Sequence, residues 1–262
     1  MMDLGLKGKV ALISGGTHGI GQAIALALVR EGSRVAVFSR TQARIDETLA
    51  LIRRMGGDGL GFMADAACRE DMDRVVDDVV VRWKTVDILV NNVGGGGSWG
   101  KDVVEDTDEC VWHEVYEKNT VAALKLTMRV IPLMRQQKWG RVVTITSIFG
   151  REAGGRPWFT MAKAAQGALM KTLARKEYLA QDGITFNSVA PGAIMIPETG
   201  WEKKAKENPQ ELADFIKREL PLGRLGTPEE VASIVLFICS QQAGFLNGAS
   251  VPVDGGQSKS LF

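Results

Sequence analysis

Seven short apolar runs, separated by longer amphipathic stretches, constrain this chain more than any other feature of its sequence. The runs are apolar on both faces, which is typical of strands covered on both sides of a sheet. The stretches repeat their apolar residues at helical spacing. Strands that alternate with helices pair in parallel through right-handed crossovers. The predicted strands are 10–13, 34–38, 61–63, 87–90, 141–146, 184–189 and 250–253, and the predicted helices are 20–29, 41–55, 69–83, 108–137, 157–180 and 228–240.

This alternation predicts one doubly wound, Rossmann-like α/β domain over residues 1–262, with a seven-stranded parallel sheet and helices on both faces. No internal repeat or linker-like stretch divides the sequence. Residues 197–222 depart from the alternation with two short polar helical pieces. Because ligands bind beyond the carboxyl ends of parallel strands, we expect this segment to be a lid over the binding site.

Charge and composition exclude several classes of protein. The 32 basic and 31 acidic residues leave a net charge of +1, too little to attract nucleic acid. No apolar run approaches the ~18 residues that span a bilayer, and the first ten residues lack the apolar core of a signal peptide. Cys68, Cys110 and Cys239 are widely spaced, and His18 and His113 share no ligand cluster. We therefore expect a cytoplasmic, reduced protein with no membrane or nucleic-acid partner and no catalytic metal.

A glycine-rich turn, SGGTHGIG at residues 14–21, joins the first predicted strand to the first predicted helix. Glycine lets the backbone turn tightly and approach a phosphate, and the helix N-terminus supplies free N–H groups. The spacing of Gly15, Gly19 and Gly21 differs from G-x-G-x-x-G, and no Lys-Ser or Lys-Thr pair of a nucleotide-hydrolysing P-loop follows. The position of the turn nevertheless predicts a dinucleotide site.

This turn resembles the TGxxxGIG turn of the short-chain dehydrogenases/reductases, and further motifs follow in family order along almost the whole chain. The resemblance implies the same fold, an NAD(P)-dependent reaction on a small-molecule carbonyl or alcohol, and homotetramers or homodimers built through the two long helices, 108–137 and 157–180. The matching segments are Asn91-Asn92-Val93-Gly94, Asn119, Thr146-Ser147-Ile148-Phe149-Gly150, Lys163, Pro191-Gly192 and Val253-Asp254-Gly255-Gly256.

The end of the second predicted strand indicates the cofactor. NAD-using relatives carry an Asp there, whereas this chain has Ser39 and Arg40, which can hold a 2′-phosphate. His18 lies where NADP-using relatives often carry Arg, so we predict NADP(H) rather than NAD(H); alternatively, Arg40 is a solvated surface charge. Asp65 resembles the family Asp that holds the adenine, and it also lies where it can cap the next helix. The predicted cofactor-binding residues are Gly15, Thr17, His18, Gly19, Ile20, Gly21, Ser39, Arg40, Asp65, Ala66, Asn92, Gly94, Lys163, Pro191, Gly192 and Ile194.

The family implies four roles at the reaction centre. Ser147 polarises the substrate oxygen, Lys163 holds the nicotinamide ribose and lowers the pKa of a tyrosine four residues earlier, and Asn119 holds a water in a proton relay. The tyrosine position is Phe159, which cannot transfer a proton. Loss of a positioned general acid typically lowers the rate about 10²–10⁴-fold. Three explanations stay open: an engineered Tyr→Phe change, a natural enzyme that uses a substrate group or water as the acid, or a non-catalytic NADP(H)-binding sensor or scaffold.

Three tryptophans are predicted to form walls of the substrate pocket: Trp99 after a run of four glycines, Trp158 beside Phe159, and Trp201 in the lid. The glycine run is equally typical of a plain flexible loop. Where the family often has a Thr that bonds the nicotinamide amide, this chain has Ile196; Thr199, or the backbone around Ile194, can take over that contact.

Overall fold

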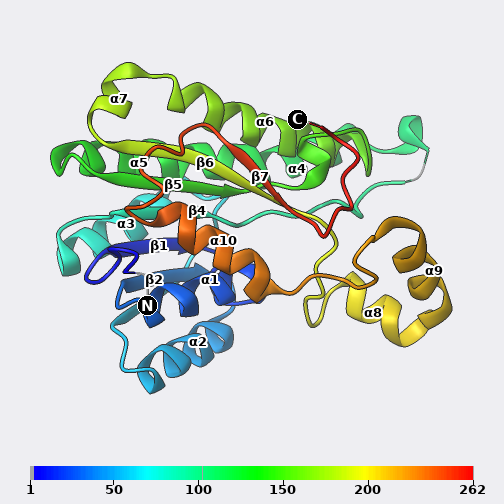
Figure 1. The fold of residues 1–262 in the computed structure, drawn as a ribbon, viewed down its shortest axis with the longest axis horizontal. Coiled ribbons are helices and arrows are strands. Elements are labelled where there is room, and N and C mark those ends of the chain that lie inside the picture. Colours follow the sequence, from blue (N-terminus) through cyan, green and yellow to red (C-terminus); the bar gives the residue numbers. More distant parts are fainter. Residues whose placement is uncertain (1–2, 102, 262) are drawn as a thin grey trace.

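The computed structural model describes residues 3–101 and 103–261, so the outer limits of the predicted 1–262 domain lie outside the described residues. The described strands form one sheet in the order β3-β2-β1-β4-β5-β6-β7, and each neighbouring pair is parallel (Figure 1). The predicted fold class is confirmed. The strands are β1 (Val10–Ser14), β2 (Arg34–Ser39), β3 (Gly59–Met63), β4 (Ile88–Asn91), β5 (Gly140–Ile145), β6 (Ile184–Pro191) and β7 (Ser250–Val253).

Helices cover both faces of the sheet, and α8 and α9 lie apart from it, at the right of Figure 1. For most of these elements, the predicted boundaries lie within one or two residues of the observed ones. The helices are α1 (Gly19–Arg30), α2 (Gln42–Arg54), α3 (Arg69–Trp83), α4 (Glu109–Tyr116), α5 (Ala122–Gln136), α6 (Pro157–Ala174), α7 (Glu177–Gln181), α8 (Gly200–Glu207), α9 (Pro209–Glu219) and α10 (Pro228–Cys239).

Two predicted helices were wrong in detail. The predicted helix 157–180 ends at Ala174, because the N–H groups of Arg175 and Lys176 bond to carbonyls three residues back, which tightens and closes the last turn. The predicted helix 108–137 contains a π-helical turn, Glu117–Val121, between α4 and α5. Such turns are common at functional sites, and this one carries Asn119.

The two faces of the sheet bury separate apolar clusters, as alternation along each strand requires. Val10 and Leu12 of β1 face the cluster that includes residues of α3, α5 and α6. Ala11 and Ile13, between and beyond them, face the cluster that includes residues of α1 and α10. Strand order reverses between β1 and β4, so a crevice opens beyond the carboxyl ends of these two strands.

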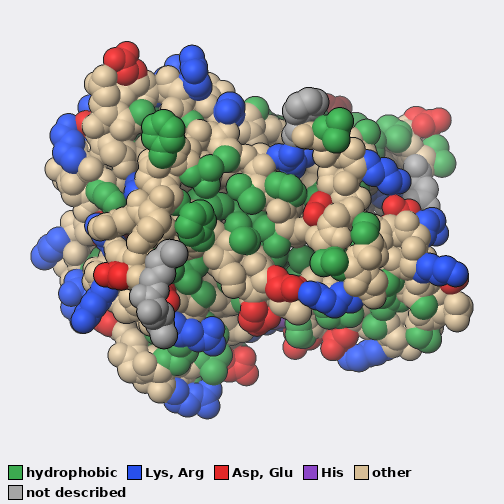
Figure 2. Space-filling model, viewed as in Figure 1, with side chains coloured by type: hydrophobic (Ala, Val, Ile, Leu, Met, Phe, Trp, Pro, Cys, Tyr) green, Lys and Arg blue, Asp and Glu red, His purple; other side chains and the backbone are tan. Residues whose placement is uncertain are grey.

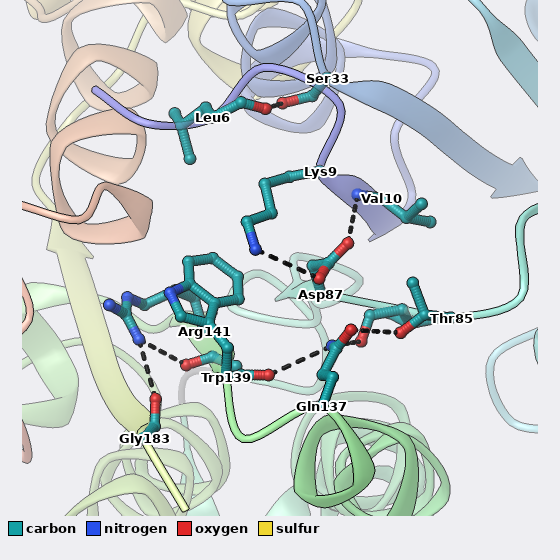
Figure 3. A network of polar contacts seen from close by, with 12 residues as sticks. Leu6, Lys9, Val10, Ser33, Thr85, Asp87, Gln137, Trp139, Arg141 and Gly183 are labelled. Carbon is teal, nitrogen blue, oxygen red and sulfur yellow. Dashed lines mark hydrogen bonds and ion pairs between the residues drawn. The ribbon is translucent and has the colours of Figure 1, made fainter. Parts of the chain in front are cut away.

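The opposite end of the sheet is fixed by a polar network (Figure 3). The buried Asp87 carboxylate accepts a 2.7 Å hydrogen bond from the Val10 N–H and lies 3.6 Å from the Lys9 ammonium. The Lys9 ammonium and the Arg141 guanidinium lie 3.8 Å and 4.5 Å from the centroid of the Trp139 ring. These contacts join the starts of β1, β4 and β5, and so fix the relative positions of the strands whose opposite ends carry the functional loops.

No helix among the described residues is both long and apolar enough to cross a bilayer.

Candidate functional site

Two adjoining cavities lie at the carboxyl ends of the strands. We call the first, of about 740 Å³, the reaction cavity, because Ser147, Phe159 and Lys163 line it. We call the second, of about 530 Å³, the nucleotide cavity, because Ser39, Arg40 and Asp65 line it. His18, Asn92 and Gly94 line both. Every predicted cofactor-binding residue lines one of the two cavities except Gly21, the last residue of the glycine-rich turn.

The glycine-rich turn is packed too tightly for side chains. Gly15 and Gly19 have φ angles of +62° and +52°, in the left-handed region that favours glycine. A Cβ on Gly21 would lie 2.3 Å from the Gly15 carbonyl oxygen, and one on Gly19 would lie 2.7 Å from Ile196 Cγ2. Asn92 Nδ2 donates to the Gly15 carbonyl at 3.1 Å and so ties the turn to the end of β4. Glycine at these positions therefore allows the close backbone packing that this turn requires.

The N-terminus of α1 suits an anion. His18 is the N-cap residue, and the first turn of the helix contains no acidic residue. The His18 Nε2 atom is buried, and it has no hydrogen-bond partner among the described residues. Buried polar atoms normally have partners. A phosphate at the positive end of this helix supplies one, so the residues present fit the phosphates of a dinucleotide.

Basic groups meet at the nucleotide cavity. The exposed Arg40 side chain lies 3.8 Å from the Asp65 carboxylate. Arg44, on the first turn of α2, also lines the cavity and pairs with Glu198 at 2.5 Å. Lys118 lines it too, and burial together with the nearby Arg40 charge lowers the pKa of its ammonium. Arg44 and Lys118 were missed from the sequence; the signal for Arg44 was its place in the first turn of the predicted helix 41–55, four residues after Arg40.

Asp65 does not cap α3, so that alternative was wrong. Its carboxylate accepts from the Ala67 N–H at 3.0 Å, and the N-cap residue of α3 is Cys68. The side chain instead belongs to the wall of the nucleotide cavity, four residues before the helix begins.

Two of the three predicted substrate tryptophans lie elsewhere. Trp158 is fully buried and packs edge-on against Trp112, with ring centroids 5.3 Å apart, because an apolar cluster between α4 and α6 takes its indole. Trp99 lines the nucleotide cavity rather than the reaction cavity, where the Lys118 ammonium lies 4.6 Å from its ring. Trp201 does line the reaction cavity, and its ring packs on Phe215 of α9.

Lys163 is held at the base of the reaction cavity. Its ammonium donates to the Ile145 carbonyl and to Gln166 Oε1, both at 3.0 Å. The side chain is 4% exposed, and burial lowers the pKa of the ammonium from 10.5 to about 7. The Lys163 Nζ atom lies 5.7 Å from the centre of the Phe159 ring. The predicted pair is thus brought together, with a ring that carries no oxygen.

Asn119 organises the loop that follows β4. Its Nδ2 donates to the Gly95 carbonyl at 2.8 Å, and its Oδ1 accepts from the Gly95 N–H at 3.1 Å. A Cβ on Gly94 would lie 2.6 Å from Asn119 Oδ1 and 2.9 Å from Lys163 Nζ. The Asn119 main-chain carbonyl accepts a 2.8 Å bond from Gln166 Nε2. Gln166 was missed from the sequence, although a polar residue three positions after Lys163 lies on the same helix face.

Ser147 and the segment after β6 complete the reaction cavity. Ser147 Oγ accepts from the Phe149 N–H at 3.2 Å, which leaves the hydroxyl hydrogen available. Thr199 lines the cavity and donates to the Ile196 carbonyl at 2.6 Å. Ile196 and Ile194 line it as well. Among the residues that the structure describes, no group of three His, Cys, Asp or Glu side chains is arranged to hold a metal ion.

The comparisons agree with this geometry. A family model described as "Enoyl-(Acyl carrier protein) reductase" matches residues 15–258. The chain is 35% identical over 260 residues to "Dehydrogenase/reductase SDR family member 4" of Mus musculus, covering 98% of this chain and 89% of that protein. It is 33% identical over 270 residues to cyclohexanol dehydrogenase of Rhodococcus sp. (strain TK6), covering 97% of each. L-sorbose reductase of Gluconobacter frateurii, solved with NADPH and L-sorbose, superposes with a TM-score of 0.91 at 32% identity, covering 99% of this chain and 100% of that one.

The parallel sheet with helices on both faces and a cavity at its point of strand-order reversal is Rossmann-like, and together with these relatives it places the chain among the oxidoreductases. More specifically, the chain belongs to the short-chain dehydrogenase/reductase family.

Proposed function

We propose that this protein binds NADP(H) and reduces the carbonyl group of a small molecule, or oxidises the corresponding alcohol, with a proton-transfer step weakened by Phe159. The observation that carries the proposal is the shared cavity wall. Ser147, Phe159 and Lys163 line one cavity, and the basic nucleotide cavity adjoins it through His18 and Gly94. Groups for binding a dinucleotide and groups for polarising a carbonyl thus lie within one crevice.

The choice of NADP(H) rests on charge. No carboxylate side chain stands at the end of β2, where Ser39 and Arg40 line the nucleotide cavity. Arg44 adds a second guanidinium there, and guanidinium–phosphate contacts are among the stronger charge-assisted hydrogen bonds. The Asp65 carboxylate partly offsets Arg40. L-sorbose reductase, a structural relative, was solved with NADPH, which supports the same assignment here.

Each residue of the reaction cavity has its own role in the proposed reaction. The bound nicotinamide supplies or accepts the hydride. Ser147 donates its hydroxyl hydrogen to the substrate oxygen and polarises the carbonyl. Lys163, whose pKa of about 7 leaves it partly protonated near neutral pH, places a positive charge beside the same region. Phe159 fills the space of a tyrosine ring without its proton, so the proton for the developing alkoxide comes from water or from the substrate.

We propose that residues 197–222 form the lid. The segment includes α8 and α9, which extend away from the sheet in Figure 1. Trp201 and Lys204 of α8 line the reaction cavity, and Lys204 is paired with Glu211 of α9 at 2.6 Å. Leu212 and Leu220 pack in a small apolar cluster that also includes Ala193 and Leu225, which lie just outside the two ends of the segment, so this cluster anchors the lid beside the cavity.

We also propose a homodimer or homotetramer formed through the long helices. Leu124 and Met128 of α5 and Met161 of α6 present exposed apolar side chains. Figure 2 shows a second apolar area around the edge strand β7. Phe245, in the segment that joins α10 to β7, is fully exposed. Static light scattering tests this proposal; a monomer across micromolar concentrations would contradict it.

The test of the activity compares this protein with Phe159→Tyr. NADPH consumption is followed over a panel of ketones that includes ketose sugars and cyclic ketones, the classes that the names of the relatives suggest. We expect Phe159→Tyr to turn over about 10²–10⁴-fold faster, as restoration of a positioned general acid predicts. NADPH binding, followed by fluorescence, should be similar in both proteins.

Other outcomes would change the conclusion. Equal turnover in both proteins would show that another acid operates and that Phe159 is not a defect. Binding of NADPH without turnover in either protein, over a wide panel, would favour a non-catalytic NADP(H)-binding sensor or scaffold.

A further inference from the structure

Gln166 connects two groups of the site that are far apart in sequence. Its Oε1 atom accepts from Lys163 Nζ at 3.0 Å, and its Nε2 atom donates to the Asn119 main-chain carbonyl at 2.8 Å. Gln166 and Asn119 are both 0% exposed. A single side-chain amide therefore spans directly from the π-helical turn between α4 and α5 to the ammonium on α6.

The orientation of this amide follows from its partners. An ammonium has only hydrogens to offer, and a carbonyl oxygen only accepts. The flipped amide would place donor against donor at Lys163 and acceptor against acceptor at Asn119. Gln166 is thus held in one orientation, with its carbonyl oxygen toward the charge.

The bond to Gln166 limits the direction in which Lys163 can donate its remaining hydrogen. Of its three N–H donors, one goes to the Ile145 carbonyl and one to Gln166, which leaves one for the reaction cavity that Lys163 lines. We propose that Gln166 is a positioning residue that directs the remaining Lys163 N–H into the cavity and stabilises the ammonium form of Lys163. That this N–H meets the cofactor rests on the proposed function; the positioning itself does not.

No carboxylate takes part in these contacts, so the partners of the buried charge are neutral. A neutral acceptor stabilises an ammonium less than a carboxylate does. This agrees with the lowered pKa of Lys163. The amide thus holds Lys163 in place while leaving it able to lose its proton near neutral pH.

Two substitutions separate positioning from simple packing because they change the charge state of Lys163 in opposite directions. Gln166→Met keeps the length of the side chain and removes both hydrogen bonds, so the pKa of Lys163 falls. Gln166→Glu puts a carboxylate beside the ammonium, so the pKa rises, by about one to three units for a close opposite charge. The fall in Gln166→Met is the discriminating result, because removal of a residue with only a packing role would leave the pKa of Lys163 unchanged.

The measurement is the pH midpoint of the Lys163 ¹³Cε resonance in cofactor-free protein labelled with [¹³Cε]lysine, assigned by its loss in Lys163→Met. This readout needs neither turnover nor NADP(H), so its failure is distinct from a failure of the proposed function. Asn187→Leu is the matched control. Asn187 is another fully buried amide, but it bonds the backbone of Leu246 and Ala249, and its loss should lower the melting temperature without moving the Lys163 midpoint.

Opposite shifts in the two variants support the proposal. A midpoint in Gln166→Met equal to that of the unsubstituted protein, or shifts of the same sign in both variants, would overturn it. If Gln166→Met does not fold, Gln166→Glu decides alone: a raised midpoint supports the proposal and an unmoved one refutes it.

Discussion

Replacement of Lys163 by Met should change how the stability of the protein depends on pH. Burial lowers the pKa of Lys163 from 10.5 to about 7, and the unfolded chain restores the ordinary value. Between these two pH values the unfolded state binds a proton that the folded state does not, so the free energy of unfolding rises with pH. The full shift corresponds to about 5 kcal/mol at about 1.4 kcal/mol per unit. Between about pH 6.5 and 9.5 the Lys163 proton should raise the free energy of unfolding of the unsubstituted protein by about 3 kcal/mol. Lys163→Met should lack this rise.

The assay is urea unfolding of cofactor-free protein at several pH values, and the quantity of interest is the difference between the two proteins. Other titrating groups are present in both and cancel. The lost bonds to Ile145 and Gln166 add a penalty that is nearly the same at each pH. Lys171→Met, which removes an exposed lysine from the same helix, should follow the pH dependence of the unsubstituted protein. Parallel curves for Lys163→Met and the unsubstituted protein would refute the reasoning.

Three further predictions concern single contacts. Gly94→Ala should weaken NADPH binding and lower thermal stability, because its Cβ would meet the Asn119 and Lys163 side chains. The control is Gly167→Ala, in the interior of α6, where the added Cβ meets no atom within 4 Å. In calorimetry this control should be neutral or should stabilise the protein by about 0.5–1 kcal/mol. Arg40→Ala should raise the Kd for NADPH about tenfold and that for NADH little, because it removes a charge-assisted bond to the 2′-phosphate; equal losses by isothermal titration would contradict the cofactor assignment. Thr227→Ala breaks the capping box of α10 and should cost about 1 kcal/mol in urea unfolding, while no loss would show that Glu230 alone suffices.

The sequence determined the architecture of this protein. Strand runs apolar on both faces, alternating with helices, leave few solutions besides a covered parallel sheet. The order and spacing of its motifs also predicted the family and, through that resemblance, the grouping of Ser147, which follows β5, with Phe159 and Lys163, which lie one helical turn apart on α6; all three line one cavity.

Tertiary structure alone decided the contacts between segments that are distant in sequence. The packing of α4 against α6 decides where Trp158 points, and the path of the glycine loop decides where Trp99 points. No local sequence pattern predicts either of these. The π-helical turn that places Asn119 lies within a stretch that reads as an uninterrupted helix. Gln166 gains its bond to Asn119 only because α6 packs against that turn, 47 residues away along the chain. Periodicity shows which face of an element is buried, but the polar partners of a buried side chain come from whichever segment the fold places beside it.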